Sequence, residues 1–167
     1  MIRIFRLFIF SWFILTSQKS FSQKIDFGLI SQIELPNFKQ VGHPTKDDLD
    51  LHNSIDAKAL TKSYLSKACI GNDAKIHISL HTNLTLNEYL KPIKKAKFKY
   101  QNVNFWTYKK VHFISLDFRF SNKNITRIIY QEPNLTTIVI LDYIQDAYLS
   151  KSISKQLIKS LSFRTSA

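Results

Sequence analysis

Apolar and polar residues alternate along much of the second half of the chain, from residue 98 to residue 143. The alternating segments are rich in aromatic and β-branched residues and are separated by short polar breaks, a pattern typical of strands with one buried face. It predicts an antiparallel β-meander. A change of parity around Gln101 and Asn102 indicates a bulge or tight turn within the meander.

Two more strands are predicted before the meander. Lys75–Thr82 (KIHISLHT) alternates with period two, as a strand requires, and Ser31–Leu35 (SQIEL) is a shorter strand that Pro36 stops. Side chains two residues apart share one face of a strand, so one apolar set should face the core. The residues expected to be buried are Ile76, Ile78, Leu80, Leu116, Phe118, Ile138 and Ile140.

The turn between residues 120 and 125 allows two registers. A three-residue loop over 122–124 places Phe118 opposite Ile128, whereas a two-residue loop places Arg127 opposite Phe118. Because a one-residue slip turns side chains to the wrong face, the longer loop is preferred, with an Asn in the left-handed conformation. Three charged residues would then share the outer face as cross-strand pairs. They are Asp117, Arg119 and Arg127.

The first predicted helix follows an irregular stretch. Residues 36–53 sustain no period and contain Gly, Pro and three Asp, which indicates a loop. A helix is then expected over Ser54–Ile70, with Asn53 or Ser54 as its N-cap and Gly71 beyond its end.

Two further helices are predicted. Thr85 and Glu88 match a capping box, so a helix should begin there and should end or kink near Leu90, because Pro92 cannot donate a backbone hydrogen bond. An amphipathic helix is expected over Ser150–Leu161. Together these elements predict an α+β fold, in which an antiparallel meander of about five to six strands packs with helices in an α/β/α sandwich-like arrangement.

Residues 1–22 predict export. Two arginines precede the apolar run of residues 7–15, and small residues occupy the −3 and −1 positions before Gln23, which is the layout of a signal peptide. The run is shorter than the roughly 18 to 20 residues that span a bilayer, so no transmembrane segment is expected. We predict cleavage between Ser22 and Gln23, and a single domain over 23–167 in the periplasm or outside the cell.

The formal net charge is +12, and +9 remains when the three basic residues of the signal are removed. Lys supplies most of this charge, in a chain that is rich in Asn and Ile and has only three Gly. This bias is typical of an AT-rich bacterial genome. Part of the positive charge can therefore reflect composition on a solvated surface rather than a binding function.

The densest local charge follows the predicted capping box. No acid occurs between Glu88 and Asp117, and Lys109 and Lys110 extend the basic segment. Such a patch suits an envelope protein or an anionic surface of lipid headgroups or polysaccharide, whereas the scarcity of Arg argues against nucleic acid. The candidate contact residues are Lys91, Lys94, Lys95, Lys97 and Lys99. The alternative is that these lysines only solvate the surface.

Residues that could carry chemistry form no known site motif. His77 and His81 would share a strand face about 13 Å apart, too far to hold one metal ion, and the acidic run over 47–50 fails the EF-hand spacing. Cys69 is the single cysteine and is expected to be a small buried residue, with an intermolecular disulfide or a reactive thiol as alternatives. No metal, cofactor or catalytic residue is predicted.

The order of the elements resembles that of the PsbP/Mog1-like group. The resemblance rests on the opening ISQIELPNF, on TLNEYL after a strand, on the long meander and on the closing SISKQLIKSLSF. It is a likeness of order and pattern over most of the mature chain. It implies a single-domain protein with an antiparallel sheet between helices, of a kind that bacteria often export, that serves in binding or assembly.

These observations predict an exported small binding or assembly-accessory domain without catalytic activity. An inhibitor or immunity-type protein against a rival toxin is an alternative, although the sequence lacks the acidic face that a basic toxin would require. A second alternative is an enzyme whose catalytic groups meet only in the fold. Its expected sign is His112 or Asp142 beside Cys69 in an open cleft.

Overall fold

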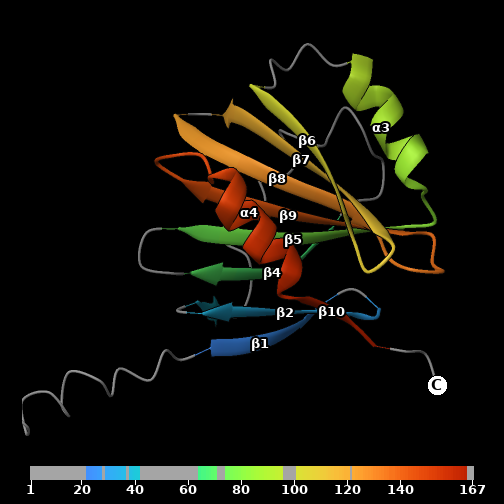
Figure 1. Ribbon diagram of the computed structural model, residues 1–167, viewed down its shortest axis with the longest axis horizontal. Helices are drawn as coiled ribbons and strands as arrows, with labels where there is room; N and C mark the ends of the chain where they lie inside the picture. The colour runs from blue at the N-terminus through green and yellow to red at the C-terminus, as the bar shows by residue number, and fades with distance from the viewer. Residues whose placement is uncertain are drawn as a thin grey trace, which may run out of the picture.

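The computed structural model describes residues 22–27, 29–36, 38–41, 64–70, 74–95, 101–120 and 122–164 (Figure 1). The strands are β1 (Ser22–Phe27), β2 (Ser31–Pro36), β3 (Lys39–Val41), β4 (Tyr64–Ile70), β5 (Lys75–Thr82), β6 (Asn102–Tyr108), β7 (Val111–Phe120), β8 (Lys123–Gln131), β9 (Thr137–Gln145) and β10 (Leu161–Phe163). The helices are α3 (Leu86–Lys95) and α4 (Lys151–Lys159).

The strands form two antiparallel sheets. The large sheet has seven strands in the order β3-β4-β5-β9-β8-β7-β6, and the small sheet has three in the order β1-β2-β10. The described part of the chain is therefore mostly β, and the prediction of an α+β fold with one five- to six-strand meander between helices is wrong. The strands that were not predicted are β1, β3, β4 and β10.

The predicted helix over 54–70 is wrong where the structure describes it. Tyr64–Ile70 form β4, which pairs with β5 along its length and with β3 on its other side; residues 54–63 lie outside the described residues. Apolar residues spaced by four suit one helical turn but also two repeats of a strand. The pairing with β5 on one side and β3 on the other stabilises the strand. β3 also forms inside the segment expected to be a loop, whose residues 42–53 are not described.

Most of the other predicted elements are confirmed. Strands β2 and β5 and the consecutive hairpins of β6 to β9 occupy the expected segments. The helix after the capping box begins as expected, but it continues to Lys95 instead of ending near Leu90. At the start of β6, Gln101 and Asn102 both lie opposite Asp117, since the Gln101 N–H donates to its carbonyl at 2.8 Å. A shared acceptor of this kind is typical of a bulge, but residues 96–100 lie outside the described residues, so the bulge or tight turn stays a prediction.

The predicted register of the β7–β8 hairpin is wrong. Phe120 pairs with Lys123, so the loop has two residues, and Phe118 lies opposite Ile125, which is neither of the two registers considered. Asn122 adopts the expected left-handed conformation, with φ 65°. The prediction assumed one polar and one apolar face, whereas the hairpin is buried on both faces. Charged residues in it therefore do not mark the solvent side.

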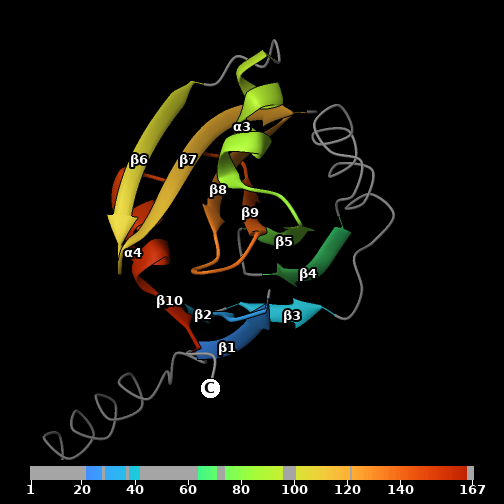
Figure 2. The same cartoon turned by 90° about the vertical axis from the view of Figure 1, so that its right-hand side faces the viewer.

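The large sheet has a core on each face. One face packs against the small sheet and against α4, which crosses in front of the sheet in Figure 1, and the opposite face packs against α3 (Figure 2). All the residues expected in the core are buried. They are Ile76, Ile78, Leu80, Leu116, Phe118, Ile138 and Ile140. Cys69 is fully buried within the first core, as expected.

Glu132 joins the two sheets. It follows β8 and is 1% exposed. Its carboxylate accepts hydrogen bonds from the backbone N–H groups of Leu29, Ile30 and Ser31 at 3.0–3.1 Å and from the Ser31 hydroxyl at 2.6 Å. Four donors compensate the burial of the charge. The turn between β1 and β2 is thereby fastened to the turn between β8 and β9.

We predict that Glu132→Ala lowers the free energy of unfolding by about 3 kcal/mol or more, because four donors lose their acceptor inside the protein. Urea denaturation followed by circular dichroism measures the change. Glu88→Ala is the matched control, since it removes an exposed carboxylate, and it should cost about 1 kcal/mol or less. Equal losses from the two variants would contradict the role of Glu132 as the junction.

Candidate functional site

A buried ion pair lies on the α3 side of the large sheet. Arg127 of β8 donates from Nε and Nη2 to the two carboxylate oxygens of Asp142 at 2.6 and 2.7 Å. Each of the two residues is 3% exposed. The fork-shaped guanidinium and the carboxylate match in a bidentate pair, which is the favourable geometry for a buried charge.

The strand registers explain why these groups meet. Asp142 of β9 lies between Arg127 of β8 and His77 of β5, because it is the register partner of both. On the same face, the His81 ring lies 5.6 Å from the ring of Tyr89, centroid to centroid. The sequence offered a signal that we did not use. Arg127 interrupts an apolar strand, and Asp142 interrupts the next one.

The ion pair also holds α3 in place. Tyr89 of α3 is fully buried, and its hydroxyl accepts a hydrogen bond from Arg127 Nη1 at 3.0 Å. At the N-terminal end of α3, the Gln131 side chain accepts from the Leu86 N–H at 3.1 Å and donates to the Leu135 carbonyl at 2.7 Å. Helix α3 is therefore fixed to the sheet at its start and at its middle.

The capping box completes the start of α3. The Thr85 N–H donates to Glu88 Oε2 at 2.8 Å, and the Glu88 N–H donates to Thr85 Oγ1 at 3.3 Å. The hydrogen bonds from the Thr85 backbone and side chain lower the pKa of Glu88. Leu86 and Leu90 pack against the second core, as expected of the buried side of this helix.

The observed register places Arg127 on the opposite face of the sheet from Asp117 and Arg119. Arg127 is in the ion pair described above, and Arg119 is exposed. Asp117 is buried and accepts hydrogen bonds from Thr126 at 2.8 Å and from Asn102 at 3.0 Å. The expected cross-strand pairing of Asp117 with the two arginines is therefore wrong.

The residues whose proximity would have indicated an enzyme, Cys69 with His112 or Asp142, lie apart. Cys69 belongs to the core that faces the small sheet, whereas Asp142 is held by Arg127 on the other side. His112 is exposed, and its Nδ1 lies 3.1 Å from the Thr107 hydroxyl. Within the described ranges, no three His, Cys, Asp or Glu side chains come together in a way that could hold a metal ion.

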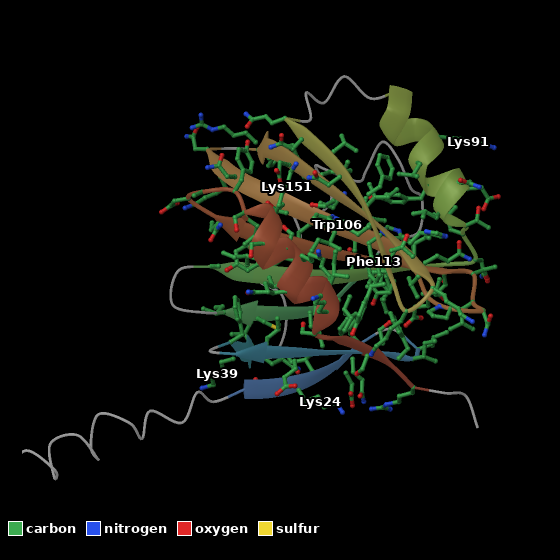
Figure 3. The ribbon with its side chains drawn as sticks, in the orientation of Figure 1. Lys24, Lys39, Lys91, Trp106, Phe113 and Lys151 are labelled. Atoms are coloured by element: carbon green, nitrogen blue, oxygen red, sulfur yellow. The ribbon has the colours of Figure 1, made fainter. Side chains whose placement is uncertain are left out.

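The structure describes only part of the lysine patch. Lys91 is exposed on α3 and points away from the sheet (Figure 3). Lys94 and Lys95 belong to α3, but their side chains are outside the description, as are Lys97 and Lys99. Other lysines lie on different parts of the surface. They are Lys24 on β1, Lys39 on β3 and Lys151 on α4 (Figure 3). Charge alone therefore does not single out a contact surface.

The last strand of the large sheet exposes apolar side chains. Phe105 and Val103 on β6 are 76% and 48% exposed, and Phe105 is the most exposed of the large apolar side chains in the described part of the chain. Both lie on the α3 side of the sheet, where their register partners on β7 are buried. Figure 2 shows β6 at the outer edge of the sheet.

The other edge of β6 presents backbone groups. Tyr108 and Val111 close a two-residue turn, so they form a hydrogen-bonded pair, and hydrogen-bonded residues then alternate along β6. The residues between them direct their N–H and C=O groups away from β7. These residues are Val103, Phe105 and Thr107. No described strand pairs with that edge.

The turn that follows β6 is basic and strained. Lys109 and Lys110 have φ values of 48° and 64°, as a type I′ turn requires. Each left-handed residue with a Cβ costs about 1 to 2 kcal/mol, and Asn-Gly is the preferred sequence for this turn. Lys109 also lies over the Tyr108 ring, with Nζ 5.1 Å from the ring centroid. We call Val103, Phe105, Thr107, Lys109 and Lys110 the β6 edge surface.

Comparison with known proteins adds no family. No protein-family model matches the chain, and no curated protein matches it at a significant level. The resemblance to the PsbP/Mog1-like group therefore stays a prediction. Neither described helix is both long enough and apolar enough to cross a membrane.

We predict that Arg127→Met lowers the free energy of unfolding by about 3 to 5 kcal/mol, because Asp142 is left buried without its partner. The double variant Arg127→Met/Asp142→Leu should recover most of this loss, since both charges are then removed. Thermal and urea melts of the two variants measure the difference. A double variant as unstable as the single one would show that the pair itself is not the source of the loss.

We also predict that Lys109→Asn/Lys110→Gly raises the free energy of unfolding by about 1 to 2 kcal/mol, because the turn strain is relieved. Lys109→Gln/Lys110→Gln is the control, since it removes the same charges and keeps the strain. It should leave the melting temperature close to that of the wild type. A gain in the control of the same size would assign the effect to charge instead of backbone strain.

Proposed function

We propose that the protein is an exported binding domain whose contact surface is the β6 edge surface, and that its partner is a protein of the cell envelope. The observation that carries the proposal is Phe105, a large apolar side chain left in water on the last strand of the sheet. Exposed apolar groups beside an open strand edge are a liability that proteins usually avoid. A partner that covers them removes this liability.

The basic turn supports the same surface. Five non-glycine residues of the described ranges have positive φ, and the three outside this turn are Asn83, Asn122 and Asn134. An AT-rich composition favours Asn as much as Lys, so composition does not explain why this turn alone uses Lys. We infer that Lys109 and Lys110 are retained for contact with an anionic partner, although they destabilise the turn.

A protein partner fits the β6 edge surface better than lipid or polysaccharide does. The outward N–H and C=O groups of β6 alternate along the strand, and another polypeptide backbone satisfies such a row. Lipid headgroups would bind the lysines, but the outward backbone N–H and C=O groups would then remain hydrogen-bonded to water. The inhibitor and enzyme alternatives stay predictions that no described contact supports.

Photo-crosslinking in the exporting cell tests this proposal. We expect benzoylphenylalanine in place of Phe105 to give a discrete adduct with an envelope protein, and we expect the Lys109→Gln/Lys110→Gln background to reduce the adduct severalfold, because the anionic contact is lost. The same label at Ile153 is the control. Ile153 is also apolar and 46% exposed, but it lies on α4, across the sheet.

Two results would contradict the proposal. Adducts of equal yield from positions 105 and 153, or a yield from position 105 that does not depend on the two lysines, would exclude the β6 edge surface as the specific contact. N-terminal sequencing of the adduct tests export in the same experiment. A mature chain that begins at Gln23 supports it, and a chain that retains residues 1–22 overturns it.

A further inference from the structure

We propose that the partner contributes an extended acidic segment that adds to β6 as an antiparallel strand. This inference rests on the proposed contact surface and goes further by naming what binds there and how. It follows from three features of β6: the direction of its outward backbone groups, the charged residues that precede and follow it in the sequence, and the exposed side chains at its centre.

The backbone geometry fixes the length of the added strand. Outward N–H and C=O groups come from Val103, Phe105 and Thr107, and β6 has seven residues. Seven residues of antiparallel strand extend about 24 Å. The inferred ligand is therefore a segment of about seven residues whose backbone pairs with three positions of β6. All strand pairs within the described part of the large sheet are antiparallel, which favours the same direction for the ligand.

The charges predict acids at both ends of the ligand. β6 itself carries no charged residue, but Lys97 and Lys99 precede it in the sequence, and Lys109 and Lys110 follow it directly. No acid lies between Glu88 and Asp117 to neutralise these lysines locally. A ligand with acids at each end and none at its centre complements this order of charge.

The side chains predict what lies between the acids. In an antiparallel pair, the residue opposite Phe105 places its side chain on the same face as Phe105. Apolar side chains at alternate positions of the ligand would therefore cover Phe105 and Val103. The intervening side chains would point to the opposite face, beside Trp106, which is half-buried there against the first core (Figure 3).

A second copy of this chain is a poorer occupant. Pairing β6 with the β6 of another copy would place the two turns of Lys109 and Lys110 side by side in a parallel pair, and in an antiparallel pair it would offer these lysines no acid, since β6 has none. Each copy also carries a large net positive charge. Like charges opposed in this way weaken self-association, and an acidic ligand replaces that repulsion with attraction.

Intrinsic fluorescence reports directly on β6. The chain has two tryptophans, Trp12 and Trp106, so a Trp12→Phe protein has Trp106 as its single emitter whether or not the signal is removed. The probe is a synthetic peptide with two acids at each end and alternating valine and threonine between them. We expect a saturable shift in Trp106 emission, and an affinity that falls about tenfold or more between low and physiological salt. A peptide with lysine in place of each acid should not bind.

The strand addition is tested through the peptide backbone. In the proposed register the valine N–H groups point to β6 and the threonine N–H groups point away. N-methylation of a valine in the alternating stretch should therefore abolish binding, whereas N-methylation of a threonine in it should change binding less than about threefold. Any other pattern overturns antiparallel strand addition. This test requires no substitution in the protein.

A matched pair of variants tests the same edge from the protein side. The Val103 N–H points away from β7, so Val103→Pro removes an outward donor and no bond within the sheet. We expect it to weaken peptide binding about tenfold or more, whereas Val103→Thr should weaken it about threefold or less. Equal binding by the two variants, with melting temperatures close to wild type, overturns strand addition.

The outcomes separate this inference from the proposed function. Loss of the envelope adduct in Lys109→Gln/Lys110→Gln, together with unchanged peptide binding in Val103→Pro, would keep the contact surface and overturn strand addition. An adduct whose yield does not depend on Lys109 and Lys110 would overturn both the contact surface and strand addition. Peptide binding that depends on the Val103 N–H and on peptide charge supports the full inference.

Discussion

Burial of the large sheet on both faces is the constraint on which the rest of the structure depends. A sheet with one wet face can leave its polar groups in water, but here each polar side chain between the strands must find a partner inside the protein. Arg127 finds Asp142 and Tyr89, and Glu132 finds four donors in the turn between β1 and β2. These partners fix α3 on one side and the small sheet on the other. Buried charged side chains therefore connect the layers of the structure.

The same constraint explains which parts of the fold the sequence predicts. Alternation identified β5 and the strands of the meander, because each strand still carries an apolar set on one face. A capping box identified α3, and amphipathic spacing identified α4. Alternation failed for the β7–β8 register, since Arg127 looked like a solvent-facing residue and is buried. It also failed for β4, where the spacing of apolar residues suits a helix and a strand alike, and where the strand pairs with β5 and with the more distant β3. Local pattern does not contain that information.

The candidate site was less accessible to sequence reasoning than the fold. The basic segment was visible, and Lys109 and Lys110 were recognised as part of it. The exposed residues Val103 and Phe105 were missed, because they alternate as core residues do and only their position on the last strand leaves them in water. Strand order is a product of long-range pairing. The left-handed backbone of the two lysines is equally invisible until the turn length is known.

In the proposed contact, Lys109 and Lys110 have two roles that ordinarily conflict: they protect the edge of β6 from unwanted pairing, and they favour pairing with the partner. An uncharged edge strand with an exposed Phe invites pairing with any other strand, and flanking Lys residues are a common protection against it. Here Lys109 and Lys110 follow the strand directly, and the strand itself carries no charged residue. In the proposed contact they repel basic strands, including those of other copies, and attract an acidic one. Because the same residues reject the wrong strand and favour the right one, specificity can be obtained without a closed pocket. The strain at Lys109 and Lys110 is consistent with this account, since a turn optimised for stability alone would carry Asn-Gly and would lose both effects.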